Sequence, residues 1–174
     1  MFSHGVLLVF RLLHIVSGVF WVGGILFLAR FLFPTTRALG PAAGPVMDHL
    51  MRVMKVPQAL LGAGVLAVLS GIGLYWNDSL GFKGEWMRSS TGMVFGTGGL
   101  LAIIALTIGA TVNAPAGKRM SALAAEIQAQ KGPPSPAQAS EMQRLQGRIG
   151  VALRVVTVLL LLAVAAMALA RYIA

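Results

Sequence analysis

A histidine and an arginine stand close together near the start of the chain, inside a long apolar segment. His14 follows Arg11 by three residues, so a helix here places both side chains on one face. Polar and ionisable side chains inside a membrane span are costly and often mark a functional site. Neutral imidazole ligates haem iron, copper or zinc, and a nearby guanidinium can pair with a haem propionate. The pair is therefore compatible with a haem, copper or zinc site, with His14 as the metal ligand and Arg11 beside a haem propionate.

Further ligands for such a metal would have to be methionines, because the later apolar segments contain no histidine. Met93 and Met167 fall in the same half of the predicted membrane region as His14, and a thioether is a soft ligand for Cu(I) or haem. The structural alternative is that Arg11 extends to the membrane surface while His14 hydrogen-bonds a neighbouring helix. The residues alone leave both interpretations open.

Several other chemistries are excluded or unsupported. The chain has no cysteine, which rules out disulfides, thiolate metal sites, iron–sulfur clusters and cysteine nucleophiles. We find no nucleophile beside a base, no phosphate-binding loop and no paired carboxylates within a span, so we predict no catalytic residue. His49 lies in a methionine-rich stretch, for which helix packing is one interpretation and a metal-entry patch the other.

Four apolar segments must position these residues. Of the 174 residues, 57% are hydrophobic and 11% are charged, whereas a soluble domain has roughly 25% charged residues. A spanning helix needs about 20 apolar residues. Four segments meet this requirement, at 5–33, 56–76, 90–112 and 149–173. The sequence therefore predicts an all-α protein, in which residues 1–174 form one integral membrane domain built as a bundle of four transmembrane helices.

The only long polar segment, 117–148, lies between the third and fourth spans. Residues 118–130 have helical periodicity, and Ser135 followed by a proline and then Gln138 has the features of a helix start. We therefore expect the third and fourth helices to extend out of the membrane as a helical hairpin.

Prolines and glycines suggest where the other helices end. Pro34 and Pro115 should break the chain after the first and third spans. The stretch 46–55 should lengthen the second helix, with a kink at Pro57.

Small residues recur within the spans. The third span carries Gly92, Gly96 and Gly99, and the first carries Gly24. Small residues let helix backbones approach closely in lipid. We expect them to form tight helix contacts; a glycine-lined ligand groove is the alternative.

The first span also carries a family resemblance. Residues 12–27 read LLHIVSGVFWVGGILF, with an early histidine, then Trp-x-Gly and an aromatic end. This segment resembles the opening helix of a group of bacterial proteins: the copper-resistance protein D membrane domain, the HemJ-type protoporphyrinogen oxidases and related four-helix membrane proteins. Trp86 before the third span and the Arg-Tyr pair ending the fourth are similar to the same layout. The resemblance implies an inner-membrane protein with a copper or haem b role and His14 as the matching ligand.

Basic residues are concentrated in the first and third loops. The second loop has only Lys83 and Arg88, offset by Asp78 and Glu85. Because cytoplasmic loops carry an excess of Lys and Arg, loops one and three should be cytoplasmic and both termini periplasmic. The basic residues behind the net charge of +9 would then interact with anionic lipid headgroups. For this reason we expect no nucleic-acid partner.

Three functions are compatible with this pattern. The first is a haem- or copper-handling protein centred on His14. The second is a non-catalytic structural or accessory subunit that packs on a larger membrane complex or on copies of itself. The third, a small transporter or channel, is the weakest, because the spans offer few polar residues to line a path. The lipid bilayer is a partner in all three.

Overall fold

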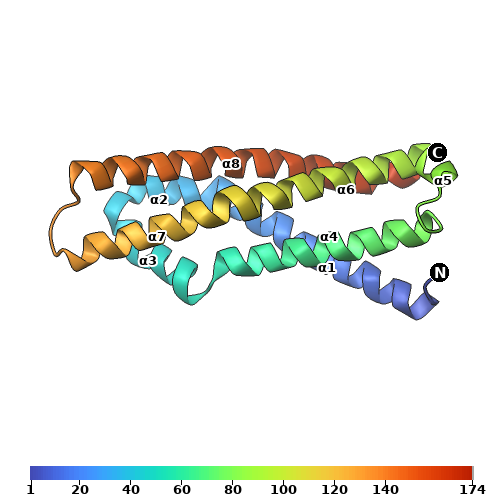
Figure 1. The fold of residues 1–174 in the computed structure, drawn as a ribbon, viewed down its shortest axis with the longest axis horizontal. Coiled ribbons are helices and arrows are strands. Elements are labelled where there is room, and N and C mark those ends of the chain that lie inside the picture. The colour runs from blue at the N-terminus through green and yellow to red at the C-terminus, as the bar shows by residue number, and fades with distance from the viewer. Residues whose placement is uncertain (174) are drawn as a thin grey trace.

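The computed structural model describes residues 1–173, and every regular element among them is a helix. Four long helices run along the long axis of the molecule (Figure 1): α1 (His4–Phe27), α4 (Val56–Asp78), α6 (Ser90–Ile108) and α8 (Pro136–Leu169). The predicted all-α class is confirmed for this part of the chain. Residue 174 of the predicted domain lies outside it.

Each long helix belongs to a continuous helical segment that is long and apolar enough to cross a membrane. These segments are His4–Leu39, Val56–Asp78, Ser90–Ala129 and Pro136–Tyr172. The first three contain the predicted spans, and the fourth contains all of 149–173 except residue 173, so the structure has the predicted number of helices able to cross a membrane.

Shorter helices lie at the two ends of the bundle. The end at the left of Figure 1 holds α2 (Phe33–Leu39), α3 (Gly44–Asp48) and α7 (Ala114–Ala129), and the opposite end holds α5 (Gly84–Met87) and both termini. Three π-helical turns and two 3-10 turns complete the chain: η1 (Leu28–Leu32), η2 (Gly40–Ala43), η3 (His49–Val53), η4 (Gly109–Asn113) and η5 (Ala170–Tyr172).

Pro34 and Pro115 do not end their helices, contrary to the prediction. Each follows a π-helical turn, η1 or η4, and stands in the first turn of the α-helix that continues beyond it. Proline has no N–H, and in an α-helix its ring clashes with the carbonyl four residues earlier. A π turn bonds i to i+5 and so displaces that carbonyl. The first and third spans therefore continue directly into α2 and α7.

The start of the second span also differs from the prediction. The stretch 46–55 does not lengthen α4, because Lys55 adopts a left-handed backbone conformation with φ of 52° and separates η3 from α4. Pro57 lies in the first turn of α4, where its missing N–H breaks no helical hydrogen bond. A sharp bend at Lys55 therefore replaces the expected kink.

The segment after the third span contains α7, a short loop and the start of α8. α7 packs on the first half of α8, and Leu123 of α7 is fully buried there. The capping box predicted at Ser135 and Gln138 is present at the start of α8. Across the pair, Arg119 Nε donates to Glu141 Oε1 over 2.9 Å. The guanidinium lowers the pKa of Glu141, chiefly through this hydrogen bond.

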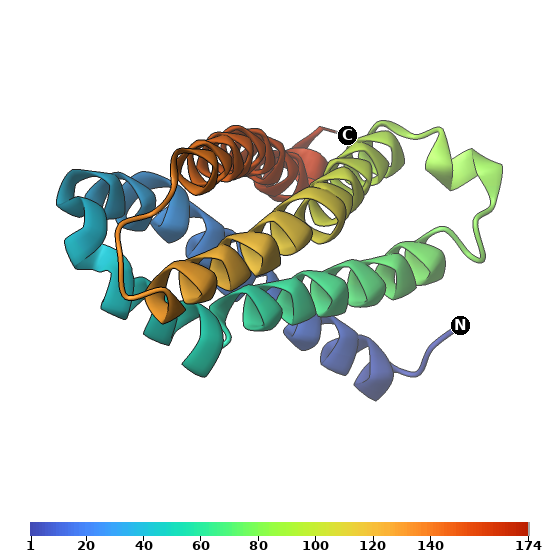
Figure 2. The same ribbon diagram turned by 60° about the vertical axis from the view of Figure 1, so that its left-hand side comes forward.

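Two antiparallel helix pairs form the bundle, α1 with α4 and α6 with α8 (Figure 2). In the first pair, large side chains of α1 lie over glycines of α4: Phe10 over Gly73, His14 over Gly71 and Trp21 over Gly64. Trp21 is only 5% exposed. Gly24 of α1 lies in turn against the buried Leu60 of α4, as expected of a small residue in a tight contact, so both helices contribute glycines to this seam.

The glycines of α6 follow the predicted packing only in part. A Cβ at Gly96 would lie 3.1 Å from the hydroxyl of Tyr75, and one at Gly98 would lie 3.2 Å from Met167 Cε. Gly99, which we expected in a contact, faces open space instead. The rotation of α6 places Gly98, rather than its neighbour, against α8.

Candidate functional site

His14 lies in the seam between α1 and α4, towards the end of the bundle that holds both termini. Its Nδ1 is 2.7 Å from the carbonyl oxygen of Ala67. A carbonyl oxygen can only accept a hydrogen bond, so this contact assigns the proton to Nδ1. A Cβ added at Gly71 would come within 2.8 Å of His14 Cε1. The imidazole reaches the backbone of α4 because position 71 has no side chain.

This hydrogen bond leaves Nε2 as the ring nitrogen with a free lone pair. Metal-binding histidines commonly donate one ring N–H to a backbone carbonyl, which fixes the tautomer and orients the other nitrogen toward the metal. The Ala67 carbonyl also accepts from Ser70 Oγ at 3.1 Å. The hydrogen bond from His14 to the Ala67 carbonyl therefore joins α1 to α4 and holds the imidazole in a tautomer whose Nε2 could bind iron.

Arg11 has different surroundings. Its side chain is exposed, whereas His14 is half-buried against α4. The ion pairs within residues 1–173 involve Arg52 and Arg119 and leave Arg11 without a carboxylate. The segment 12–29 between Arg11 and Arg30 measures about 27 Å as a helix, close to the ~30 Å hydrocarbon thickness of a bilayer. In a bilayer centred on that segment, Arg11 would reach a headgroup layer.

The two methionines predicted as ligands lie elsewhere in the bundle. Met167 packs against Gly98 in the seam between α6 and α8. Met93 is 55% exposed on the outer surface of α6. His14, in contrast, packs on α4. Within the described part of the chain, no group of three or more His, Cys, Asp or Glu side chains could hold a metal ion.

Two open grooves lie near the end that holds the termini. The larger, about 380 Å³, is lined mostly by apolar and aromatic residues: Phe2, Phe10, Leu69, Ile72, Gly73, Trp76 and Phe82. One of them, Phe10, lies one helical turn from His14. The smaller, about 230 Å³, is lined by Met1, Trp76, Asn77, Leu80, Gly81 and Lys83. The larger groove contains no charged side chain to orient a ligand.

Other polar groups inside the bundle bond to the backbone. Ser70 Oγ donates to Leu66 O at 2.6 Å, and the Tyr75 hydroxyl donates to Gly92 O at 3.1 Å. The bond of Tyr75 links α4 to α6. The exception is Asn113 in η4, whose Oδ1 is buried without a hydrogen-bond partner in residues 1–173. An asparagine at the end of an apolar segment was a sequence signal for this position.

Comparisons with known proteins do not identify this site. No family model matches the chain, and neither the curated proteins nor the solved structures contain a significant match.

Proposed function

We propose that this chain is a multi-pass protein of a bacterial inner membrane with a non-catalytic role, as a structural or accessory subunit, and that His14 serves to join α1 to α4. The observation that carries this proposal is the 2.7 Å contact from Nδ1 to the Ala67 carbonyl, made across Gly71. Side-chain hydrogen bonds between membrane helices contribute about 0.6–2 kcal/mol each. The bond accounts for a polar residue in the span without any bound ligand.

The proposed topology has both termini in the periplasm and the end with α2, α3 and α7 in the cytoplasm. The distribution of Lys and Arg supports it, because cytoplasmic loops carry the excess of positive charge. The helix lengths indicate that one end of the bundle would project beyond the membrane, and the charge distribution favours the cytoplasm for that end. Ser90–Ala129 has 40 residues, which is about 60 Å of helix, or twice the hydrocarbon thickness. The excess would project into the cytoplasm as α7 paired with the start of α8.

Reporter fusions test this orientation. A fusion after Lys131 should report the cytoplasm and a fusion after Gly81 the periplasm. The reverse result would refute the proposed topology. It would not contradict the structural role of His14.

An accessory subunit also needs a surface for other helices, and α1 has the most suitable one. Its outward face is apolar and well exposed, at Leu12, Ile15 and Val19 with 64%, 61% and 69% exposure. Only 11% of the most apolar window of this segment is buried. A helix from a larger complex, or from a second copy, would pack on this face.

The haem b alternative deserves its own test, because a specific observation favours it. The Nδ1 hydrogen bond leaves Nε2 free, so His14 could hold haem iron through that nitrogen. Copper fits less well, since Met93 and Met167 have other surroundings. A role like that of the copper-resistance protein D or HemJ-type proteins would require a bound cofactor, which would supply redox or metal-transfer chemistry. In that case Nε2 would hold the metal, and Arg11 would pair with a propionate.

Two substitutions of His14 distinguish the two functions. His14→Gln keeps an N–H donor for the Ala67 carbonyl but removes the imidazole ligand, whereas His14→Ala removes both. For a structural histidine, the purified wild type should lack a Soret band and stoichiometric metal, and His14→Gln should unfold closer to the wild-type temperature than His14→Ala. A Soret band, or near-stoichiometric copper, that is lost in His14→Gln would overturn the structural proposal in favour of the cofactor.

A further inference from the structure

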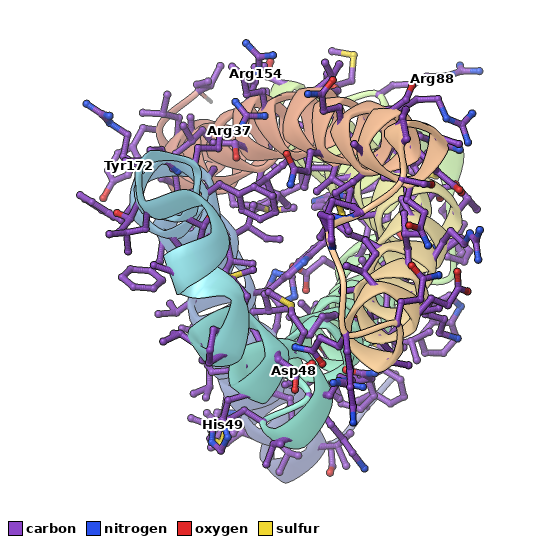
Figure 3. The ribbon with its side chains drawn as sticks, turned by 90° about the vertical axis from the view of Figure 1, so that its left-hand side faces the viewer. Arg37, Asp48, His49, Arg88, Arg154 and Tyr172 are labelled. Carbon is purple, nitrogen blue, oxygen red and sulfur yellow. The ribbon has the colours of Figure 1, made fainter. Side chains whose placement is uncertain are left out.

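Two arginines approach the same glycine at the end of the bundle that holds α2 and α7. A Cβ added at Gly150 of α8 would lie 2.9 Å from Nη2 of Arg37, which belongs to α2. On α8 itself, Nε of Arg154 donates to the carbonyl oxygen of Gly150 at 3.3 Å. Figure 3 shows both arginines along the same stretch of α8. Guanidinium nitrogens from two segments more than a hundred residues apart therefore each lie beside the same residue, Gly150.

The absence of a side chain at Gly150 makes room for the Arg37 guanidinium. Any larger residue would push the Arg37 guanidinium away from the α8 backbone, since the 2.9 Å separation is shorter than an ordinary van der Waals contact. Both arginine side chains remain exposed, so their N–H groups are accessible from outside the bundle.

No carboxylate of the described chain neutralises this pair. The sequence contains only five acidic residues. Asp48 pairs with Arg52, and both Glu126 and Glu141 pair with Arg119. The remaining two, Asp78 and Glu85, lie at the opposite end of the bundle, at the end of α4 and in α5. Within residues 1–173, both guanidinium groups are therefore available to an anion from outside the chain.

The position along α8 suggests what balances it. Arg154 lies within the apolar part of α8, and its side chain turns back toward the start of the helix to reach Gly150. A long basic side chain with this direction carries its charge from the hydrocarbon toward the headgroup layer. Guanidinium groups bind phosphate oxygens in a bidentate manner, with directed and charge-assisted hydrogen bonds. The anionic lipids of the cytoplasmic leaflet present such phosphates at this level.

We propose that Arg37 and Arg154, brought together beside Gly150, form a binding site for the phosphate of an anionic phospholipid headgroup. The assignment of the lipid to the cytoplasmic leaflet rests on the topology proposed above; the phosphate chemistry of the site does not.

The test measures lipid binding to the full-length protein in an uncharged detergent, by native mass spectrometry and by thermal shift. The probes are phosphatidylglycerol, phosphatidylcholine and inorganic phosphate. Phosphatidylglycerol should bind more tightly than phosphatidylcholine. Each of Arg37→Gln and Arg154→Gln should weaken that binding by about fivefold, and the double variant by about 25-fold. Gly150→Leu, which keeps both charges but displaces Arg37, should weaken it as much as Arg37→Gln.

The matched control is the double variant Arg88→Gln and Arg171→Gln, which removes two cations from the opposite end of the bundle. It should bind phosphatidylglycerol as the wild type does. The proposal fails if the two double variants lose affinity equally, because the preference would then follow net charge. It also fails if inorganic phosphate stabilises the protein as well as the lipid does, which would identify a site for a free anion. Neither outcome bears on the spectra that test His14.

Discussion

The seam between α1 and α4 permits a quantitative test through the exchange of Gly71 for alanine. A new Cβ would sit 2.8 Å from His14 Cε1 and 3.0 Å from Nδ1. Carbon atoms in contact prefer about 3.5–4.0 Å, so the ring must retreat by at least ~0.7 Å. Its Nδ1 is only 2.7 Å from the Ala67 carbonyl, and a retreat of this size away from α4 weakens or breaks the hydrogen bond.

The expected cost combines two terms. Loss of the interhelical hydrogen bond costs about 0.6–2 kcal/mol, and overpacking a tight contact costs about 1–3 kcal/mol. Alanine recovers up to about 1 kcal/mol of helix propensity over glycine. We therefore expect Gly71→Ala to destabilise the protein by about 1–3 kcal/mol. Gly62→Ala, on the same helix but facing open space, should be neutral or slightly stabilising.

Reversible unfolding in detergent micelles measures both variants, and a double-mutant cycle identifies the cause. In a His14→Ala background the ring is absent, so Gly71→Ala should cost little there and the coupling energy should be about 1 kcal/mol or more. Equal stabilities of the Gly71 and Gly62 variants, or a coupling energy near zero, would refute the account of this seam.

Three further predictions concern other parts of the molecule. Gly96→Leu should reduce the yield of detergent-stable protein more than Gly81→Leu, because position 96 faces a helix contact. The φ of 84° at Gly81 makes a substitution there costly, but the strain stays within the loop. Equal yields of the two variants would contradict the packing argument. Glu141→Gln should lower the unfolding temperature at neutral pH. Since the folded-state pKa of this carboxyl is depressed, its contribution is present above the unfolded-state pKa and is lost as the pH falls through the folded-state pKa, so the two proteins should converge in acid; a constant difference would refute the pairing. Asn113→Leu should stabilise the protein by about 1–3 kcal/mol, because it removes a buried acceptor without a partner in the described chain. Destabilisation in the same unfolding assay would show that the Asn113 side-chain oxygen has a partner or a role.

Local composition was enough to predict the helices themselves. Four apolar segments of spanning length indicate four membrane helices, because only a helix satisfies its own backbone hydrogen bonds in lipid. The start of α8 was predictable for a similar reason, since the capping bonds between Ser135 and Gln138 join residues three apart. Features that depend on near neighbours in the chain can be recognised in the sequence.

Helix ends and helix rotations were not predictable in this way. Pro34 and Pro115 have the residue type of helix breakers, but a π turn before each accommodates the ring. Whether Gly98 or Gly99 faces α8 depends on the rotation of α6, which the packing of the whole bundle sets. Adjacent residues of similar size give no signal by which to choose between them.

The role of His14 shows the same division most clearly. The sequence identifies an ionisable residue in an apolar span, which is costly and therefore demands a partner. It cannot name that partner, because the Ala67 carbonyl lies 53 residues away and every residue type carries a carbonyl. The contact between Arg37 and Gly150 could not be predicted from the sequence for the same reason. The sequence by itself determined which residues need partners and which segments are long and apolar enough to cross a membrane. The tertiary structure alone decided the partners, because they depend on the register and rotation of helices that are distant in the chain.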